Sequence, residues 1–145
     1  MDDMRARMER DVMQYRAIEE QMGMIEQQIA MVEETIETTN ATLETLKFMD
    51  SMKGESEILI PMGPGINLPV RTSGKEKLIV NIGAGVSVDM EPSRAAAIIQ
   101  DKLDELDSTK DKLASAYRDL GSKKMALEET IGREYSGAVG SDDQD

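Results

Sequence analysis

The sequence predicts an α+β fold in which a long antiparallel α-helical coiled-coil hairpin carries two central β-hairpins. Apolar residues recur with heptad spacing towards both chain ends, the middle alternates apolar and polar residues, and all four prolines lie between residues 61 and 92. Heptads are typical of paired helices, and alternation bounded by Gly and Pro is typical of strands. The predicted segments are a coiled-coil helix over 1–53, a β-hairpin region over 54–91, a second coiled-coil helix over 92–135 and a disordered acidic tail over 136–145.

The first segment carries a heptad through seven repeats. With residue 1 at position a, twelve of the fourteen a and d positions are apolar or aromatic, and Asp11 and Thr39 are the exceptions. A pattern sustained over this length is a strong indication of a coiled coil. A helix of about 45 residues would be about 70 Å long at 1.5 Å per residue. It is therefore too long to be wrapped inside a globule of this size.

The middle contains four short strand-like runs, which predict two β-hairpins in series. Glycine-rich turns at 63–65 and 83–85 separate the strands of each hairpin. Pro61 and Pro69 cannot donate to a ladder, so the first hairpin should lie at an edge or carry a bulge. The two turns are not phosphate-binding loops, since the second runs into a strand and neither carries a Lys-Ser/Thr pair.

The last segment repeats the heptad from Pro92, which suits a first helical turn because its missing N–H costs nothing there. Nine of the twelve a and d positions are apolar; the exceptions are Lys110, Lys124 and Glu134. Lysines at position a fix register or orientation at a cost in stability. Two such helices joined through a compact centre most simply fold back as an antiparallel pair. The alternative, two arms pointing apart, requires a separate partner for each seam.

A four-stranded sheet made from the two hairpins would have free edges and apolar side chains on both faces. Rows such as Ile58-Leu59-Ile60 show this character. Such an edge is a liability unless another chain covers it. We therefore predict that residues 54–91 form an assembly region, which closes into a barrel or sandwich with other subunits.

Methionine is the most informative residue type. Seven of the 12 methionines lie in the first 31 residues, and we interpret Met22 and Met31 as fillers of the coiled-coil seam. At the tip, where both helices end, the seam cannot be fully covered. Flexible, polarizable methionines there suit an adaptable apolar binding surface. The predicted tip surface comprises Met1, Met4, Met8, Val12, Met13, Leu127, Ile131 and Tyr135.

Composition excludes several classes of protein. The chain has 145 residues, 29 acidic and 17 basic side chains, a net charge of −12, and no Cys, His or Trp. There is thus no disulfide framework, imidazole metal site or Ser–His nucleophile, and no basic face for nucleic acid. The start lacks a signal-peptide core, and the longest apolar run, Ala95–Ile99, falls far short of the ~20 residues that span a bilayer. We expect a cytoplasmic protein without a cofactor, a metal, nucleic acid or a membrane.

The sequence also resembles a known family. A long helix ending in Thr42–Leu46, then Ile58–Gly65, then Leu78–Val86, then a second long helix is similar to prefoldin. The match is to the α-class subunit of archaeal type, which carries two hairpins between its helices where the β class carries one. It covers roughly residues 5–135. The resemblance implies a hexamer of two α-class and four β-class subunits around a double β-barrel, with six coiled-coil tentacles.

The resemblance also implies a function and its residues. Distal apolar surfaces would hold unfolded clients, without ATP, for transfer to a group II chaperonin. The barrel residues carried over by position are Ile58, Ile60, Ile79, Val80, Ile82, Val86 and Val88.

Two functions fit these observations. The first is an ATP-independent chaperone, a holdase subunit that captures unfolded proteins at the coiled-coil tip. The alternative is a non-chaperone scaffold or tethering subunit, for which specific polar or aromatic anchors would be expected instead of a Met-rich tip. An enzyme is not expected, because the acidic clusters fall on the solvated flanks of the heptads, where no neighbour desolvates them.

Overall fold

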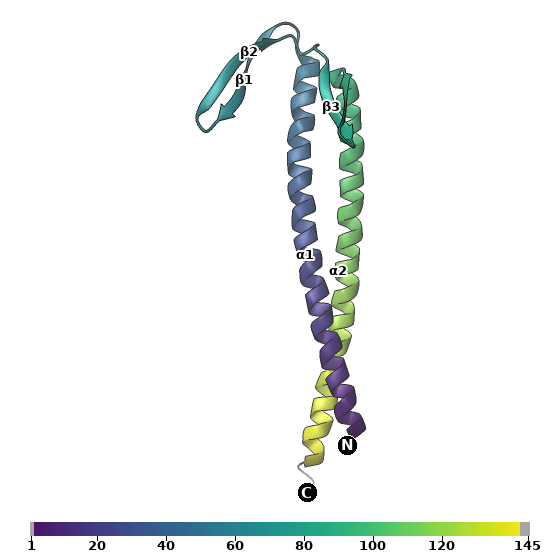
Figure 1. Cartoon of the computed structure of the whole chain (residues 1–145). Helices are drawn as coiled ribbons and strands as arrows, with labels where there is room; N and C mark the ends of the chain where they lie inside the picture. The colour runs from purple at the N-terminus through teal and green to yellow at the C-terminus, as the bar shows by residue number, and fades with distance from the viewer. Residues whose placement is uncertain (1, 143–145) are drawn as a thin grey trace. The chain divides into compact units, whose positions relative to one another are not determined.

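The computed structural model describes residues 2–142, and side chains over 2–140. Two long helices flank two antiparallel β-hairpins in chain order, which confirms the predicted fold class (Figure 1). The chain divides into two units, one of residues up to 33 and from 108 onward, the other of residues 34–107. In chain order the elements are α1 (Asp2–Ser51), β1 (Ser56–Gly63), β2 (Ile66–Thr72), β3 (Leu78–Gly83), β4 (Val86–Met90) and α2 (Pro92–Asp142).

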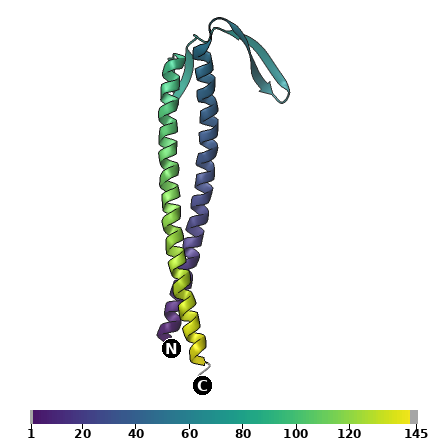
Figure 2. The ribbon, with the colours of Figure 1, turned by 180° about the vertical axis from the view of Figure 1, so that it is seen from behind.

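In the first unit α1 and α2 run antiparallel, and the helix ends at Asp2 and Asp142 lie at the same end (Figure 2). The predicted heptad matches the burial of side chains along this seam, because the a and d residues from Met8 to Val32 are half-buried while most others on α1 are exposed. The half-buried a and d residues of α1 in this unit are Met8, Asp11, Tyr15, Ile18, Met22, Ile25, Ile29 and Val32.

Met31 does not fill the seam, so that part of the methionine prediction was wrong. Its side chain is 68% exposed. The reason is its position in the heptad: the a and d residues nearest to it are Ile29 and Val32, which leaves residue 31 at position c, directed away from α2. Met22, at position a, is half-buried as predicted and lies against Gly121 of α2.

The second helix continues past its predicted end at residue 135 as far as Asp142, across most of the segment expected to be a disordered tail over 136–145. Residues 143–145 lie outside the described residues. Two glycines in this stretch each cost about 1 kcal/mol of helix stability relative to Ala. The seam offsets part of this cost, because Ala138 is half-buried one turn beyond the half-buried Glu134.

The core of the second unit joins the end of α1, the second hairpin and the start of α2. Leu46, Met90 and Ala95 are buried at its centre. The partly buried side chains packed against them are Leu78, Val80, Ala96, Ile98 and Ile99. The second hairpin is therefore anchored on the helices through one row of apolar side chains.

The two hairpins form separate two-stranded sheets, β1 with β2 and β3 with β4, rather than the four-stranded sheet considered from the sequence. The connection between β2 and β3 explains this. Gly74 has a φ of +74° and lies against the carbonyl of Met49, while the Lys75 ammonium donates to the Asp50 carbonyl oxygen at 3.0 Å. Because the link is held on the end of α1, β2 does not continue directly into a ladder with β3.

Each hairpin carries a bulge beside its turn. The register shifts between Pro61 and Gly63 in the first hairpin, which confirms the bulge expected from proline, and between Asn81 and Gly83 in the second. The turns differ in conformation. Ala84 and Gly85 both have positive φ, as in a type I′ turn, whereas the first turn has proline at the corresponding position, where φ is fixed near −65°.

Replacement of Gly74 by Ala should destabilise the second unit. The added Cβ would overlap the Met49 carbonyl oxygen, and the alanine would have to adopt a positive φ. We expect a loss of about 2 kcal/mol in the free energy of unfolding, measured by urea titration. Gly54→Ala is the control, since no atom lies within 4 Å of a Cβ at that position. Equal stabilities of the two variants would contradict this account of the link.

Candidate functional site

Two salt bridges set the register of the helix pair in the first unit. Lys110 Nζ lies 3.3 Å from Glu33 Oε1, and Lys124 Nζ lies 3.6 Å from Glu19 Oε1. Both lysines occupy a positions of α2, and the glutamates lie on the flank of α1 beside the seam. Exposed pairs of this kind contribute only about 0–1 kcal/mol each. Their main effect is to define the alignment, which agrees with the role predicted for lysines at position a.

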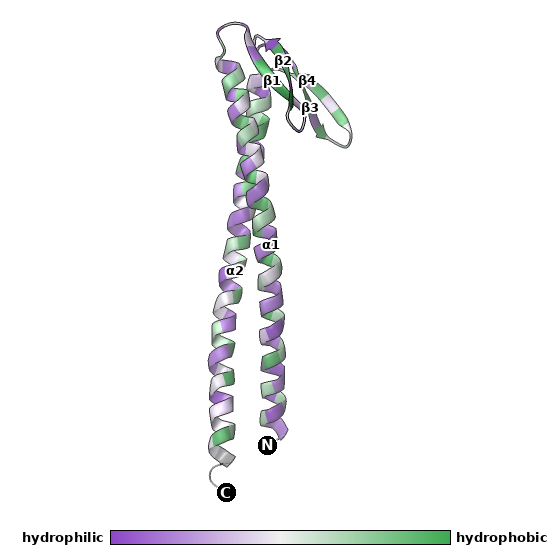
Figure 3. Cartoon of the chain, turned by 90° about the vertical axis from the view of Figure 1, so that its left-hand side faces the viewer, coloured by the Kyte–Doolittle hydropathy of each residue, from purple (hydrophilic) through white to green (hydrophobic). Residues whose placement is uncertain are grey.

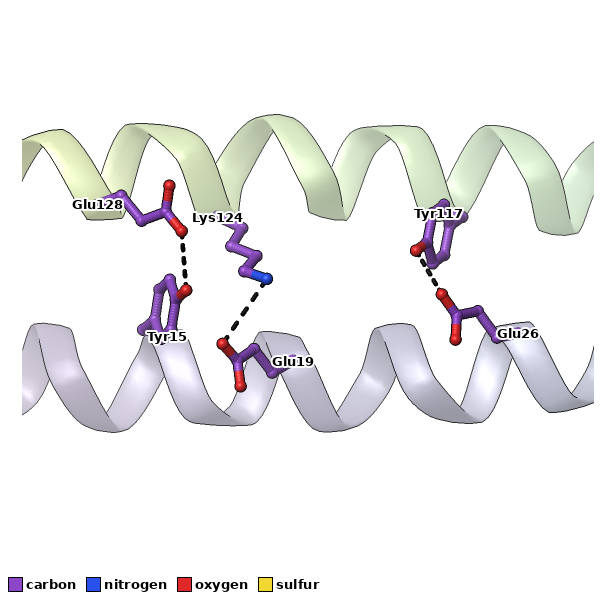
Figure 4. A network of polar contacts seen from close by, with 6 residues as sticks. All are labelled: Tyr15, Glu19, Glu26, Tyr117, Lys124 and Glu128. Atoms are coloured by element: carbon purple, nitrogen blue, oxygen red, sulfur yellow. Dashed lines mark hydrogen bonds and ion pairs between the residues drawn. The ribbon is translucent and has the colours of Figure 1, made fainter.

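Two tyrosine hydroxyls tie the same helices together (Figure 4). Tyr15 of α1 donates to Glu128 Oε1 at 2.8 Å, and Tyr117 of α2 donates to Glu26 Oε1 at 2.5 Å. These hydrogen bonds to carboxylates raise the pKa of both tyrosines above the ordinary value. Lys124 Nζ also lies 5.4 Å from the centroid of the Tyr15 ring, a cation–π distance. The helix pair is thus held by polar contacts up to the level of Tyr15.

Beyond Tyr15, towards the chain ends, the seam opens into a shallow pocket of about 410 Å³, which we call the seam pocket. It brings together four of the predicted tip residues, two from each helix. Met8, Val12 and Ile131 are half-buried, and Tyr135 is 59% exposed. The complete lining is Met8, Val12, Tyr15, Glu128, Ile131, Gly132 and Tyr135.

A second hollow, of about 480 Å³, lies on α1 alone, and we call it the outer groove. It shares Met8 and Val12 with the seam pocket, so these two side chains separate the two hollows. Met13, 71% exposed, belongs only to this groove. Its lining residues are Arg5, Met8, Glu9, Val12, Met13 and Arg16.

The remaining predicted tip residues are distributed differently. Met4 is 47% exposed and lines neither hollow. Leu127 is half-buried farther along the seam, where it borders a separate hollow with Ile18 and Leu120. Met1 lies outside the described residues. The apolar surface near the chain ends therefore centres on Met8 and Val12.

Two carboxylates face each other in the seam beside these hollows. Asp11 and Glu134 both occupy d positions and are half-buried. Glu134 Oε2 is buried without a hydrogen-bond partner. Burial raises the pKa of Glu134, the hydrogen bond and negative charge of Asp11 raise it further, and the Arg7 guanidinium partly opposes the shift. Two carboxyl groups thus meet where a coiled coil normally places apolar side chains.

Sequence reasoning identified Asp11 and Glu134 as exceptions to the heptads but did not pair them. The pairing follows only from the register, which the contacts of Lys110 and Lys124 define. The arginines of the outer groove were also missed. Their spacing in the sequence indicates a common helix face, because Arg5 and Arg16 lie three helical turns apart with apolar residues between them.

Replacement of Glu134 by Gln should raise the Tm of the chain at pH 7. Because the folded-state pKa of Glu134 lies above the ordinary 4.5, its ionised form destabilises the folded seam, and this cost is present above the folded pKa. It is relieved as the pH falls towards 4.5, because Glu134 then binds a proton in the wild type. The gain in Tm, followed by circular dichroism, should therefore shrink on acidification.

The control for this variant is Glu129→Gln, at an exposed glutamate of the same helix. It removes the same charge from an acidic chain but should change the Tm less. A gain equal in the two variants, or independent of pH, would contradict the assignment of a strained carboxylate pair.

The predicted assembly residues lie on the two hairpins, where hydrophobic residues follow the strands (Figure 3). Ile79 is the most exposed of them, at 77%, whereas Val80 is half-buried against the core of the second unit. Ile58 is also half-buried, and the other four are exposed: Ile60, Ile82, Val86 and Val88. The hairpins thus present more apolar surface than one chain covers.

Over residues 2–142, no helix is long and apolar enough to cross a membrane. In the same part of the chain, no group of three or more acidic side chains is placed to hold a metal ion.

A heptad-paired helix hairpin combined with two hairpins of exposed apolar side chains defines a coiled-coil assembly subunit. The family model described as prefoldin subunit matches residues 18–136, so the chain belongs to the prefoldin family. Among curated relatives, it is similar to prefoldin subunit alpha of Methanococcoides burtonii, 26% identical over 88 residues, which cover 61% of this chain and 64% of the relative.

Other comparisons agree. Prefoldin subunit alpha of Methanocorpusculum labreanum is 25% identical over 92 residues, covering 63% of each chain. Among solved structures, a chain of filamentous PFD from Methanocaldococcus jannaschii matches with a TM-score of 0.66 and 26% identity, covering 79% of this chain and 94% of that one. The match spans slightly less than two thirds of the length of these two curated relatives.

Proposed function

We propose that the chain is an ATP-independent holdase subunit, which captures unfolded proteins at the end of its helix pair, prevents their aggregation and passes them to a chaperonin in the cytoplasm. Membership of the prefoldin family supports a chaperone. The observation that carries the client site is the pair of shallow hollows that share Met8 and Val12. They leave apolar side chains accessible between the chain ends and the hydrogen bond of Tyr15 to Glu128.

The chemistry of these hollows suits transient capture. Both are open and shallow, and neither has the enclosed shape that binds one defined ligand tightly. Methionine side chains adapt to different apolar partners because they are unbranched and polarizable. Several weak contacts from neighbouring subunits would combine through high effective concentration, so that modest affinity at each tip suffices and release needs no ATP.

The hairpins would supply the assembly. Exposed apolar residues on both two-stranded sheets, together with unpaired strand edges, favour closure with other subunits into a β-barrel. The proposed partners are β-class prefoldin subunits, in a hexamer of two α-class and four β-class chains. Ile60 and Ile79 provide one exposed isoleucine on each hairpin, whereas Val80 is already engaged in the core of its own chain.

Replacement of Met8 and Met13 by Ser should weaken client capture. We expect about a tenfold rise in the amount of chain needed to halve the aggregation of a denatured client, since two apolar contacts are lost. Light scattering measures this, with unrelated clients in parallel. Met24→Ser with Met125→Ser is the control, because it removes two exposed methionines that lie outside both hollows. Unchanged suppression by the first pair would refute the client site.

Replacement of Ile60 and Ile79 by Asp should prevent assembly, because two charges would enter an apolar interface. Native mass measurement of the chain co-expressed with a β-class subunit should show the hexamer replaced by smaller species. Asn67→Asp with Asn81→Asp places the same charges on exposed polar positions of the same hairpins and should leave the complex intact. A hexamer that survives the isoleucine substitutions would exclude these residues from the interface.

A further inference from the structure

The basic residues of α1 are concentrated near its start. Between Asp2 and Ser51 they comprise four arginines within residues 5–16 and Lys47. The run over 17–46 contains seven acidic residues and no basic one. In a chain of net charge −12, most of α1 therefore repels an acidic partner, whereas residues 2–16 contain four acidic residues and four arginines and carry no net charge.

Two of these arginines mark the ends of the outer groove. Arg5 and Arg16 are exposed and lie eleven residues apart on one helix, a rise of about 16 Å. The apolar floor of methionine and valine side chains lies between them. Glu9 borders the groove near its middle. The groove is thus apolar along its length, cationic at both ends and anionic near the centre.

We infer that the outer groove selects client segments in which a short apolar core is flanked by acidic residues on both sides. A rise of about 16 Å corresponds to about five residues of extended chain. Guanidinium groups bind carboxylates through paired hydrogen bonds, which matches acidic flanks. Glu9 repels a carboxylate placed in the core. The inference deepens the proposed function, on which it rests, by naming the class of client segment.

The seam pocket does not share this preference. It contains Glu128, whose carboxylate accepts the hydroxyl hydrogen bond of Tyr15, and its lining residues include no lysine or arginine. The two hollows are therefore complementary. The seam pocket offers apolar contact from both helices, and the outer groove adds selection by charge.

Exposed ion pairs are weak, so the expected selectivity is modest. Two such pairs predict about a fivefold preference for an acidic-flanked segment over a basic-flanked one. Because the arginines are solvated, the preference should decline as salt is raised from about 0.05 to 0.5 M. The apolar core of the segment should set the affinity that remains at high salt.

Two fluorescein-labelled peptides test the inference on the full chain. Both contain the core Leu-Val-Phe-Leu-Ala; one has two Glu on each side and the other two Lys. Fluorescence anisotropy should give a Kd about fivefold lower for the Glu-flanked peptide. Arg5→Glu with Arg16→Glu should reverse this order. Lys102→Glu with Lys112→Glu, at exposed lysines outside the groove, makes the same change in net charge and should preserve the order.

The outcomes separate this inference from the proposed function. Equal binding of the two peptides, or tighter binding of the Lys-flanked one, overturns the charge preference. So does a preference that both double variants lose equally, because the loss would then follow from the added negative charge alone and not from the groove. If neither peptide binds while the chain still suppresses client aggregation, the groove assignment fails and the holdase stands. If the wild-type chain does not suppress client aggregation, the proposed function is overturned instead.

Discussion

The heptad seam between α1 and α2 is the constraint on which the functional surfaces depend. Its register is defined by Lys110 with Glu33 and Lys124 with Glu19, contacts that repeat at heptad spacing along both helices. Given this register, the apolar residues near the chain ends meet to form the seam pocket. A shift of one heptad would separate them. The salt bridges therefore matter through alignment, although each contributes little to stability.

In the second unit, one hairpin is held more firmly than the other. The buried cluster of Leu46, Met90 and Ala95 takes one strand residue, Met90, from β4, and Val80 of β3 packs against it. Ile79, the residue before Val80 in β3, points the other way and is largely exposed. Alternation along one strand thus assigns one face to the chain's own core and leaves the other face exposed.

Periodicity predicted the helices, the strands and most of the seam, because burial in a coiled coil follows position in the heptad. Its failures have specific causes. Met31 was assigned to the seam by residue type, although position c directs it outward. The end of α2 was placed too early, because composition near Gly137 outweighed the apolar position at Ala138. The outer groove could not be predicted, since a hollow depends on how side chains of successive turns lie together.

The seam and the proposed capture surface make opposing demands on the same residues. A d layer of leucines would close the helices and bury Met8 and Ile131. Instead the two d residues beside the hollows are Asp11 and Glu134, whose charges oppose close approach. The seam is therefore weakened beside the residues of the proposed capture surface. The tyrosine and lysine contacts begin immediately beyond this region and keep the rest of the unit paired, so that a weak tip can exist on a well-defined helix pair.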